Sequence, residues 1–207
     1  MDRTFVIRLL EELKNVMQEN KEYLIDLDLV VGDGDLGLTM SDGFFAAYEA
    51  AKNSSETDLG KLFYLAGKAM STAVPSTMGT LMASGLMQAG KVLKGKAQME
   101  AEDIATFFMA YEEGVMTRGK AKIGEKTFLD GIDPAITAIK SALLTGNDLV
   151  ETAKRAELAA KKGYEQTATM LAVHGRAATR GEASRALKDP GAYVAYLMMS
   201  ALVRSVS

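Results

Sequence analysis

The sequence contains no cysteine, no tryptophan and only one histidine. The absence of cysteine excludes disulfides, zinc–thiolate sites and thiol nucleophiles, and it is typical of a protein in a reducing compartment. The residues from Asp2 to Lys14 alternate charged and apolar types, unlike a signal peptide, and no apolar run is long enough to span a membrane. We therefore expect a cytoplasmic protein that makes no use of a membrane.

An excess of positive charge is also missing, because the net charge is −3. No basic stripe with interleaved aromatic residues occurs, so nucleic acid is not the expected partner. Strand patterns are scarce, and the only strand-like piece is Leu29–Val31. Apolar residues instead recur at helical spacing, as at Phe5, Leu9 and Leu13. We predict a single all-α domain over residues 1–207, with about seven to nine helices.

Capping signals predict where several helices begin. Ser41 or Asp42 can cap one helix. Asp133 followed by Pro134 places proline at the first position of another helix, where its missing N–H has no cost. Asp189, also followed by proline, is expected to begin the last helix.

Four stretches rich in glycine and polar residues separate helices of ordinary composition. They cover residues 32–37, 74–79, 118–127 and 175–191. In an antiparallel bundle alternate loops share one end, so several of these stretches are expected to converge on one site.

A cluster of carboxylates without a neighbouring cation is the most informative feature of the chain. Asp28, Asp33 and Asp35 lie in a glycine-rich stretch, and no lysine or arginine occurs between Lys21 and Lys52. Clustered carboxylates repel one another unless a cation is bound. Mg²⁺ and Ca²⁺ prefer oxygen ligands, so the pattern predicts a hard divalent cation. The alternative is an acidic turn exposed to solvent, with glycine for tight geometry.

The same cluster indicates what else binds there. Mg²⁺ is usually held by one or two carboxylates together with substrate phosphates, so a phosphate ligand is the expected partner. Three carboxylates beside an ATP-like tail of about four negative charges require about two divalent cations. The stretch does not match an EF-hand, and no Walker sequence occurs, so a nucleotide site here is not a P-loop.

Other motifs allow two interpretations each. The basic stretch 118–127 is either a surface loop that ends a helix or a flexible rim near phosphates. Gly79–Thr80 is either an ordinary helix start or a source of backbone N–H groups for a phosphate. Arg176 can pair with a phosphate or with a carboxylate. His174, the only histidine, is expected to be structural or a peripheral contact rather than a phosphohistidine.

Read together, these motifs resemble the L subunit of dihydroxyacetone kinase, the nucleotide-binding half of that enzyme. The matching pieces occur in the family's order and span nearly the whole chain. They are Leu27–Asp28, Gly32–Met40, Gly79–Leu81, Arg118–Ala121, Gly124–Thr127, Gly175–Ala177 and Asp189–Ala192.

The resemblance implies an antiparallel barrel of eight helices with a nucleotide, ADP or ATP, at one end. It implies that Asp28, Asp33 and Asp35 hold two Mg²⁺ ions against the phosphates, with no further catalytic residue in this chain. It also implies nucleotide contacts from a larger set of residues: Leu36, Gly37, Leu38, Thr39, Thr77, Met78, Gly79, Gly119, Phe128, Arg176, Asp189, Pro190 and Gly191.

The resemblance further implies a kinase subunit that works with other proteins. The phosphoryl acceptor, dihydroxyacetone or a similar small hydroxyketone, is held on a partner K subunit. In one branch of the family, ADP stays bound as a coenzyme and is recharged by a phosphohistidine carrier, the M subunit of a phosphotransferase system. We expect this branch, and a homodimer is a further expectation.

Two positions depart from the family pattern. The family often has histidine where this chain has Leu36, and a serine where it has Met78. The alternative hypothesis is therefore a non-catalytic, nucleotide-binding regulatory paralogue that acts by docking to another protein.

Overall fold

The computed structural model describes residues 1–207 and consists of helices and their connections, with no strand. Eight α-helices have 15 to 19 residues, and α2 has 11. The elements are α1 (Arg3–Glu19), α2 (Lys21–Val31), α3 (Leu36–Lys52), α4 (Leu59–Ala73), α5 (Thr77–Val92), α6 (Ala101–Gly119), α7 (Phe128–Leu144), α8 (Leu149–Gln166), η1 (Thr167–Thr169), η2 (Arg176–Ser184) and α9 (Pro190–Val206). None of the helices combines the length and hydropathy needed to cross a lipid bilayer.

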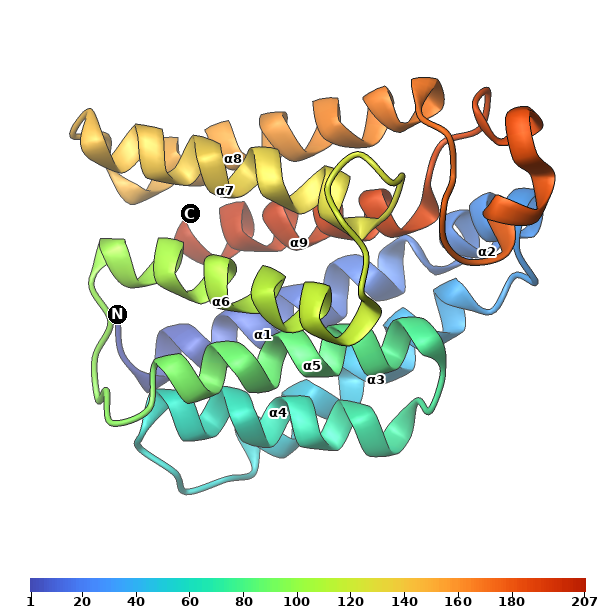
Figure 1. Ribbon diagram of the computed structural model, residues 1–207. Coiled ribbons are helices and arrows are strands. Elements are labelled where there is room, and N and C mark those ends of the chain that lie inside the picture. Colours follow the sequence, from blue (N-terminus) through green and yellow to red (C-terminus); the bar gives the residue numbers. More distant parts are fainter.

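The eight longer helices form a closed ring. Each packs against the next in the order α1, α3, α4, α5, α6, α7, α8 and α9, and α9 packs against α1. Successive helices run in opposite directions, and both termini lie at the same end of the ring (Figure 1). The shorter α2 packs against α3 at the opposite end. The predicted antiparallel barrel of eight helices is confirmed.

The interior of the ring is a continuous apolar core of 48 buried residues. The core contains a chain of aromatic rings, in which the Phe63 and Phe107 centroids lie 4.5 Å apart and Phe107 meets Phe108 edge-on at 5.0 Å. Aromatic contacts of this geometry stabilise a core beyond the area they bury. The core thus supplies a rigid frame for the loops at the ends of the helices.

Helix direction decides which loops lie together. Because the helices alternate in direction, the connections 32–35, 74–76, 120–127 and 167–189 all fall at the end of the ring next to α2 (Figure 1). The expected convergence of the four glycine-rich stretches is therefore observed. The same alternation places the N-termini of α3, α5, α7 and α9 at that end.

Leu29–Val31, the only strand-like piece of the sequence, forms the last turn of α2, as the all-α prediction requires. Two expected helix starts were wrong. The helix expected to begin near Ser41 or Asp42 begins at Leu36 instead, so both residues lie inside α3.

The second difference concerns the start of α7. This helix begins at Phe128, and Pro134 lies inside it rather than at its first position. Thr127 and Asp130 form a capping box. The Asp130 carboxylate accepts the backbone N–H of Thr127, and the Thr127 hydroxyl accepts a backbone N–H from the first turn of the helix. Such a box pairs two backbone N–H groups that have no partner within the helix, so the helix begins N-terminal to the proline.

The α6 residue Glu112 provides a test of the packing. Its Oε1 atom is buried without a hydrogen-bond partner, and burial, with a smaller contribution from Asp133, raises the pKa of this carboxyl to about 7. The folded protein therefore binds this proton more tightly than the unfolded chain, and the wild-type free energy of unfolding falls as pH rises from about 4.5 to about 7. We expect Glu112→Gln to stabilise the protein by about 1–3 kcal/mol at pH 8 and by little at pH 5.

Urea unfolding at the two pH values measures this difference. Glu113→Gln, at the exposed neighbouring position, is the matched control and is expected to show no such pH dependence. A Glu112→Gln advantage of equal size at both pH values would contradict the assignment of the effect to the buried charge.

Candidate functional site

A cavity of about 760 Å³ lies at the end of the barrel where the four connections meet. Its walls come from the 28–36 segment, the start of α5, the end of α6, the start of α7, residues 174–177 and the start of α9. This volume is typical of a site for a small molecule or cofactor.

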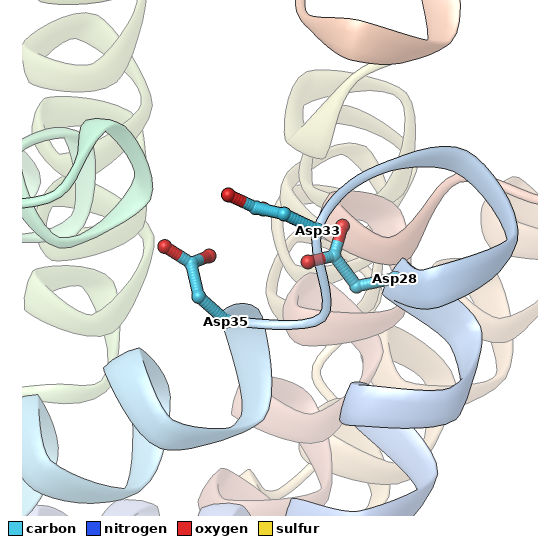
Figure 2. A group of neighbouring side chains, drawn as sticks. All are labelled: Asp28, Asp33 and Asp35. Carbon is cyan, nitrogen blue, oxygen red and sulfur yellow. The ribbon is translucent and has the colours of Figure 1, made fainter.

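Three carboxylates gather at this cavity. Asp28 lies on α2, Asp33 in the following loop and Asp35 directly before α3, as Figure 2 shows. One oxygen of each lies within 4.8 Å of the others. Asp28 Oδ2 accepts the backbone N–H of Gly34 at 2.9 Å, which fixes the loop around it.

The electrostatics of the cluster favour a cation. Burial raises the pKa of Asp28; two backbone N–H bonds oppose this rise, and the charges of Asp33 and Asp35 add to it. A bound cation removes the repulsion among the three side chains. All three offer oxygen donors and no histidine or cysteine belongs to the group, so the donor set fits Mg²⁺ or another hard divalent ion.

The tertiary structure also supplies a cation that is absent nearby in the sequence. Arg176 Nη2 donates to Asp33 Oδ2 at 2.5 Å, across 143 positions of the chain. Both side chains are well exposed, at 67% and 42%, so solvent screening keeps this ion pair weak. Of the two interpretations of Arg176, the structure shows the carboxylate contact, and a weak pair of this kind is easily exchanged for a metal ion or a phosphate.

Helix N-termini make the same cavity favourable for anions. The first residues of α3, α5, α7 and α9 line it: Leu36, Thr77, Phe128 and Pro190. A helix N-terminus carries a partial positive charge and unpaired N–H groups, which bind phosphate well. The cavity thus combines carboxylates suited to a cation with four helix ends suited to an anion.

Apolar side chains form other parts of the wall. They include Val31, Leu36, Met78, Leu81, Val115, Phe128 and Leu129. A ligand with both a flat apolar part and a charged tail matches this mixed lining.

The structure brings most of the predicted site residues to this cavity. Twelve of them line it: Asp28, Asp33, Asp35, Leu36, Thr77, Met78, Gly119, Phe128, Arg176, Asp189, Pro190 and Gly191. Thr77, Met78 and Gly79 belong to the first turn of α5 rather than to a loop, because Ser76 caps this helix by accepting the N–H of Gly79.

Four predicted residues lie outside the cavity lining. Leu38 and Thr39 line a second hollow of about 310 Å³ between α3 and the 73–76 segment. Gly37 and Gly79 are buried in backbone contacts, Gly37 against α2 and Gly79 against Val74. For these four residues the structure indicates packing or surface positions.

Five further residues line the cavity although they were not among the predicted ligand contacts; all belong to the stretches 74–79 and 118–127 or to the Gly79–Thr80 motif: Ser76, Thr80, Arg118, Lys126 and Thr127. His174, expected to be structural or peripheral, also lines the cavity, and its Nε2 lies 2.6 Å from Glu125 Oε2. Lys126 is the least expected, because it is 2% exposed and a lysine in a basic stretch normally faces solvent. No sequence pattern marks it out from its neighbours.

The fold and the cavity define a helical-barrel protein with a carboxylate cluster and an anion-favouring site at one end. The model of the DAK2 domain matches residues 30–204. The chain belongs to the DAK2 domain family, and its resemblance to the L subunits of dihydroxyacetone kinases is confirmed.

Two of the curated relatives match over nearly their whole length, and a third is a longer protein. The chain is 32% identical over 204 residues to the ADP-binding subunit DhaL of PEP-dependent dihydroxyacetone kinase 1 from Listeria innocua, covering 99% of this chain and 97% of the relative. It is 31% identical to the ADP-binding subunit DhaL of the PTS-dependent dihydroxyacetone kinase from Lactococcus lactis, covering 97% and 96%. It is also 32% identical to an L-erythrulose 1-kinase from Mycolicibacterium smegmatis, of which it spans only 34%.

Solved structures support the fold. The dihydroxyacetone kinase of C. freundii in complex with AMP-PNP and Mg²⁺ superimposes with a TM-score of 0.74 at 22% identity. The match covers 98% of this chain and 34% of that longer protein. At this identity the likeness shows that the helical barrel is shared.

Proposed function

We propose that this chain is the nucleotide-binding subunit of a dihydroxyacetone kinase, and that it holds ADP or ATP together with two Mg²⁺ ions. One observation carries the proposal: the Asp28, Asp33 and Asp35 carboxylates meet within 4.8 Å at a cavity that four helix N-termini also line. The names of the end-to-end relatives, which are ADP-binding subunits, support it.

Different residues of the cavity are proposed to bind the metal ions, the phosphates and the adenine ring. Asp28, Asp33 and Asp35 are the proposed metal ligands, and bound Mg²⁺ neutralises phosphate charge and aligns the group to be transferred. The N-terminus of α5 offers backbone N–H groups to phosphate oxygens. Arg176 is placed to exchange its exposed contact with Asp33 for a phosphate oxygen. Phe128 and Met78 belong to the apolar wall that an adenine ring requires.

The proposed reaction is phosphoryl transfer to a small hydroxyketone held on a partner K subunit. The acceptor hydroxyl oxygen forms a bond to the γ-phosphorus while the bond to the β-phosphate oxygen breaks, and the hydroxyl proton leaves to a base. We assign this base to the partner K subunit, because the acceptor hydroxyl is held there. Catalysis by this chain is then positioning and charge neutralisation.

The names of the relatives support a proposal for the source of the phosphoryl group. Those that match this chain over nearly their full length are named PEP-dependent or PTS-dependent. We propose that ADP remains bound as a coenzyme and is recharged by a phosphohistidine carrier, the M subunit. The L-erythrulose 1-kinase relative widens the proposed acceptor to small hydroxyketones as a class.

Mass analysis of the ligand retained by freshly purified protein tests the proposal. We expect about one ADP per chain, lost after dialysis against a chelator, because the carboxylate cluster repels phosphate once its cations are removed. Dialysis against buffer with Mg²⁺ is the control.

Two other results would change the conclusion. Protein that carries no adenine nucleotide, and binds none when ADP and Mg²⁺ are added, contradicts the proposed function. Protein that retains ADP, yet transfers no phosphoryl group when K and M subunits of a relative are supplied, favours the regulatory paralogue.

A further inference from the structure

The chain between η1 and α9 lacks the apolar contacts that hold the rest of the fold. We call residues 170–188 the cap segment, because its residues 174–177 line the cavity. Within it only Ala172 and Ser184 are buried. Burial of two small side chains contributes little, and Met170, Leu171 and Leu187 are only partly buried, so polar contacts are important in holding this segment in place.

Lys126 makes the most concentrated of these contacts. Its backbone adopts the left-handed conformation, with φ of 62°, and its side chain is buried. Its Nζ atom donates to the backbone carbonyls of Met170 at 3.2 Å, Ser184 at 2.5 Å and Leu187 at 2.5 Å. These three acceptors lie at the beginning and the end of the cap segment, so one ammonium group ties both ends together.

Every hydrogen-bond donor of the Lys126 ammonium group has an acceptor. An ammonium group has three donors and no acceptor, and all three donors are used by carbonyls of the cap segment. A lysine in a phosphate-binding cavity usually serves as a phosphate ligand, but this one has no free N–H. If the cap segment opened, the ammonium would exchange three charge-assisted hydrogen bonds for contacts with water, and this exchange costs free energy.

The residue before it adds weaker contacts of the same kind. The Glu125 carbonyl accepts the N–H of Val173 at 3.3 Å, and the Glu125 carboxylate lies 2.6 Å from His174 Nε2. The side chains of the latter pair are partly exposed, which reduces their contribution. The connection between α6 and α7 therefore holds the cap segment chiefly through Lys126.

We propose that Lys126 is a positioning residue that fastens the cap segment at the cavity and thereby slows the release of bound nucleotide. This inference rests on the proposed function, because a nucleotide that serves as a coenzyme must stay bound for a long time, and we assign this slow release to Lys126. Nucleotide release requires the cap segment to move away from the cavity wall, and this movement breaks the three Lys126 bonds.

Two measurements on the full chain test the inference. Lys126→Met keeps the length of the side chain and removes its donors, and Lys122→Met is the matched control at an exposed position of the same connection. In the nucleotide-free protein, hydrogen exchange of residues 170–188 is expected to be at least about tenfold faster in Lys126→Met, with the core helices unchanged. Dissociation of a fluorescent ADP analogue with Mg²⁺ is expected to accelerate about tenfold, and association, which passes through the same opening, is expected not to slow.

Lys126→Gln, which retains two donors, is expected to give intermediate exchange and dissociation rates. It also serves as the test variant if Lys126→Met does not fold. A role limited to global stability would raise hydrogen exchange in the core helices as well, and that result overturns the inference.

Other outcomes overturn it in different ways. Wild-type exchange of the cap segment in Lys126→Met shows that this lysine does not fasten it. Slower association of nucleotide with unchanged cap exchange shows that Lys126 is a phosphate ligand instead. If wild-type protein binds no nucleotide, the proposed function fails, whereas the exchange experiment still decides whether Lys126 holds the cap segment.

Discussion

Asp33→Asn is expected to abolish Mg²⁺-dependent nucleotide retention and to leave the helical content intact. The substitution removes one of three charges that face the proposed metals, and we expect the affinity for ADP with Mg²⁺ to fall by roughly 100-fold or more. The fold is spared because the only side-chain partner of Asp33 is the exposed Arg176. Calorimetric titration of ADP with Mg²⁺, together with circular dichroism, measures both effects.

Asp26→Asn is the matched control for this experiment. Asp26 lies on α2 with Asp28, is exposed and does not belong to the carboxylate cluster. Its substitution changes the net charge of the chain by the same amount as Asp33→Asn. Wild-type nucleotide retention in Asp33→Asn, or an equal loss of retention in Asp26→Asn, would contradict the assignment of Asp33 as a metal ligand.

Gly37→Ala is expected to destabilise the protein although it adds a residue that favours helices. An alanine methyl at this position would overlap the backbone carbonyl of Lys21 and the side chain of Ile25 in α2. Replacing glycine by alanine inside a helix normally stabilises by up to about 1 kcal/mol. Here we expect a loss of about 1–3 kcal/mol, because the close contact between α2 and α3 leaves no space.

The same change is expected to weaken nucleotide binding without touching the cavity. Asp28 is carried by α2 and Asp35 by the start of α3, so pushing the two helices apart separates two of the proposed metal ligands. Urea unfolding and the ADP titration measure the two effects. Gly119→Ala is the control for stability, since its methyl meets only the end of the Leu81 side chain. A stabilising Gly37→Ala would refute the packing argument.

The helical class and the carboxylate cluster were predictable from the sequence because both depend on local information. Apolar residues at helical spacing identify helices without knowledge of their partners. Asp28, Asp33 and Asp35 lie within eight positions of one another, so their mutual repulsion is a property of that short stretch. The start of α7 was mistaken for a different reason: Asp133–Pro134 and the Thr127–Asp130 box are both valid signals, and only one can begin the helix.

Contacts between distant parts of the chain were not predictable in the same way. Nothing near Asp33 in the sequence indicates that Arg176 will pair with it, and nothing in the basic stretch distinguishes the buried Lys126 from the exposed Lys122. Gly37 resembles a ligand-binding glycine in the sequence, yet its place is set by the approach of α2. Each of these roles depends on which helices become neighbours.

The sequence by itself determined that the chain is helical, that its acidic stretch favours a hard cation, and that it resembles dihydroxyacetone kinase L subunits. The tertiary structure decided what completes that site. Closing eight antiparallel helices into a ring brings four helix N-termini and residues 174–177 of the cap segment, Arg176 among them, to the carboxylates. The physical reason is that periodicity and charge act within a few residues, whereas the direction and neighbours of each helix are set only when the whole apolar core is packed.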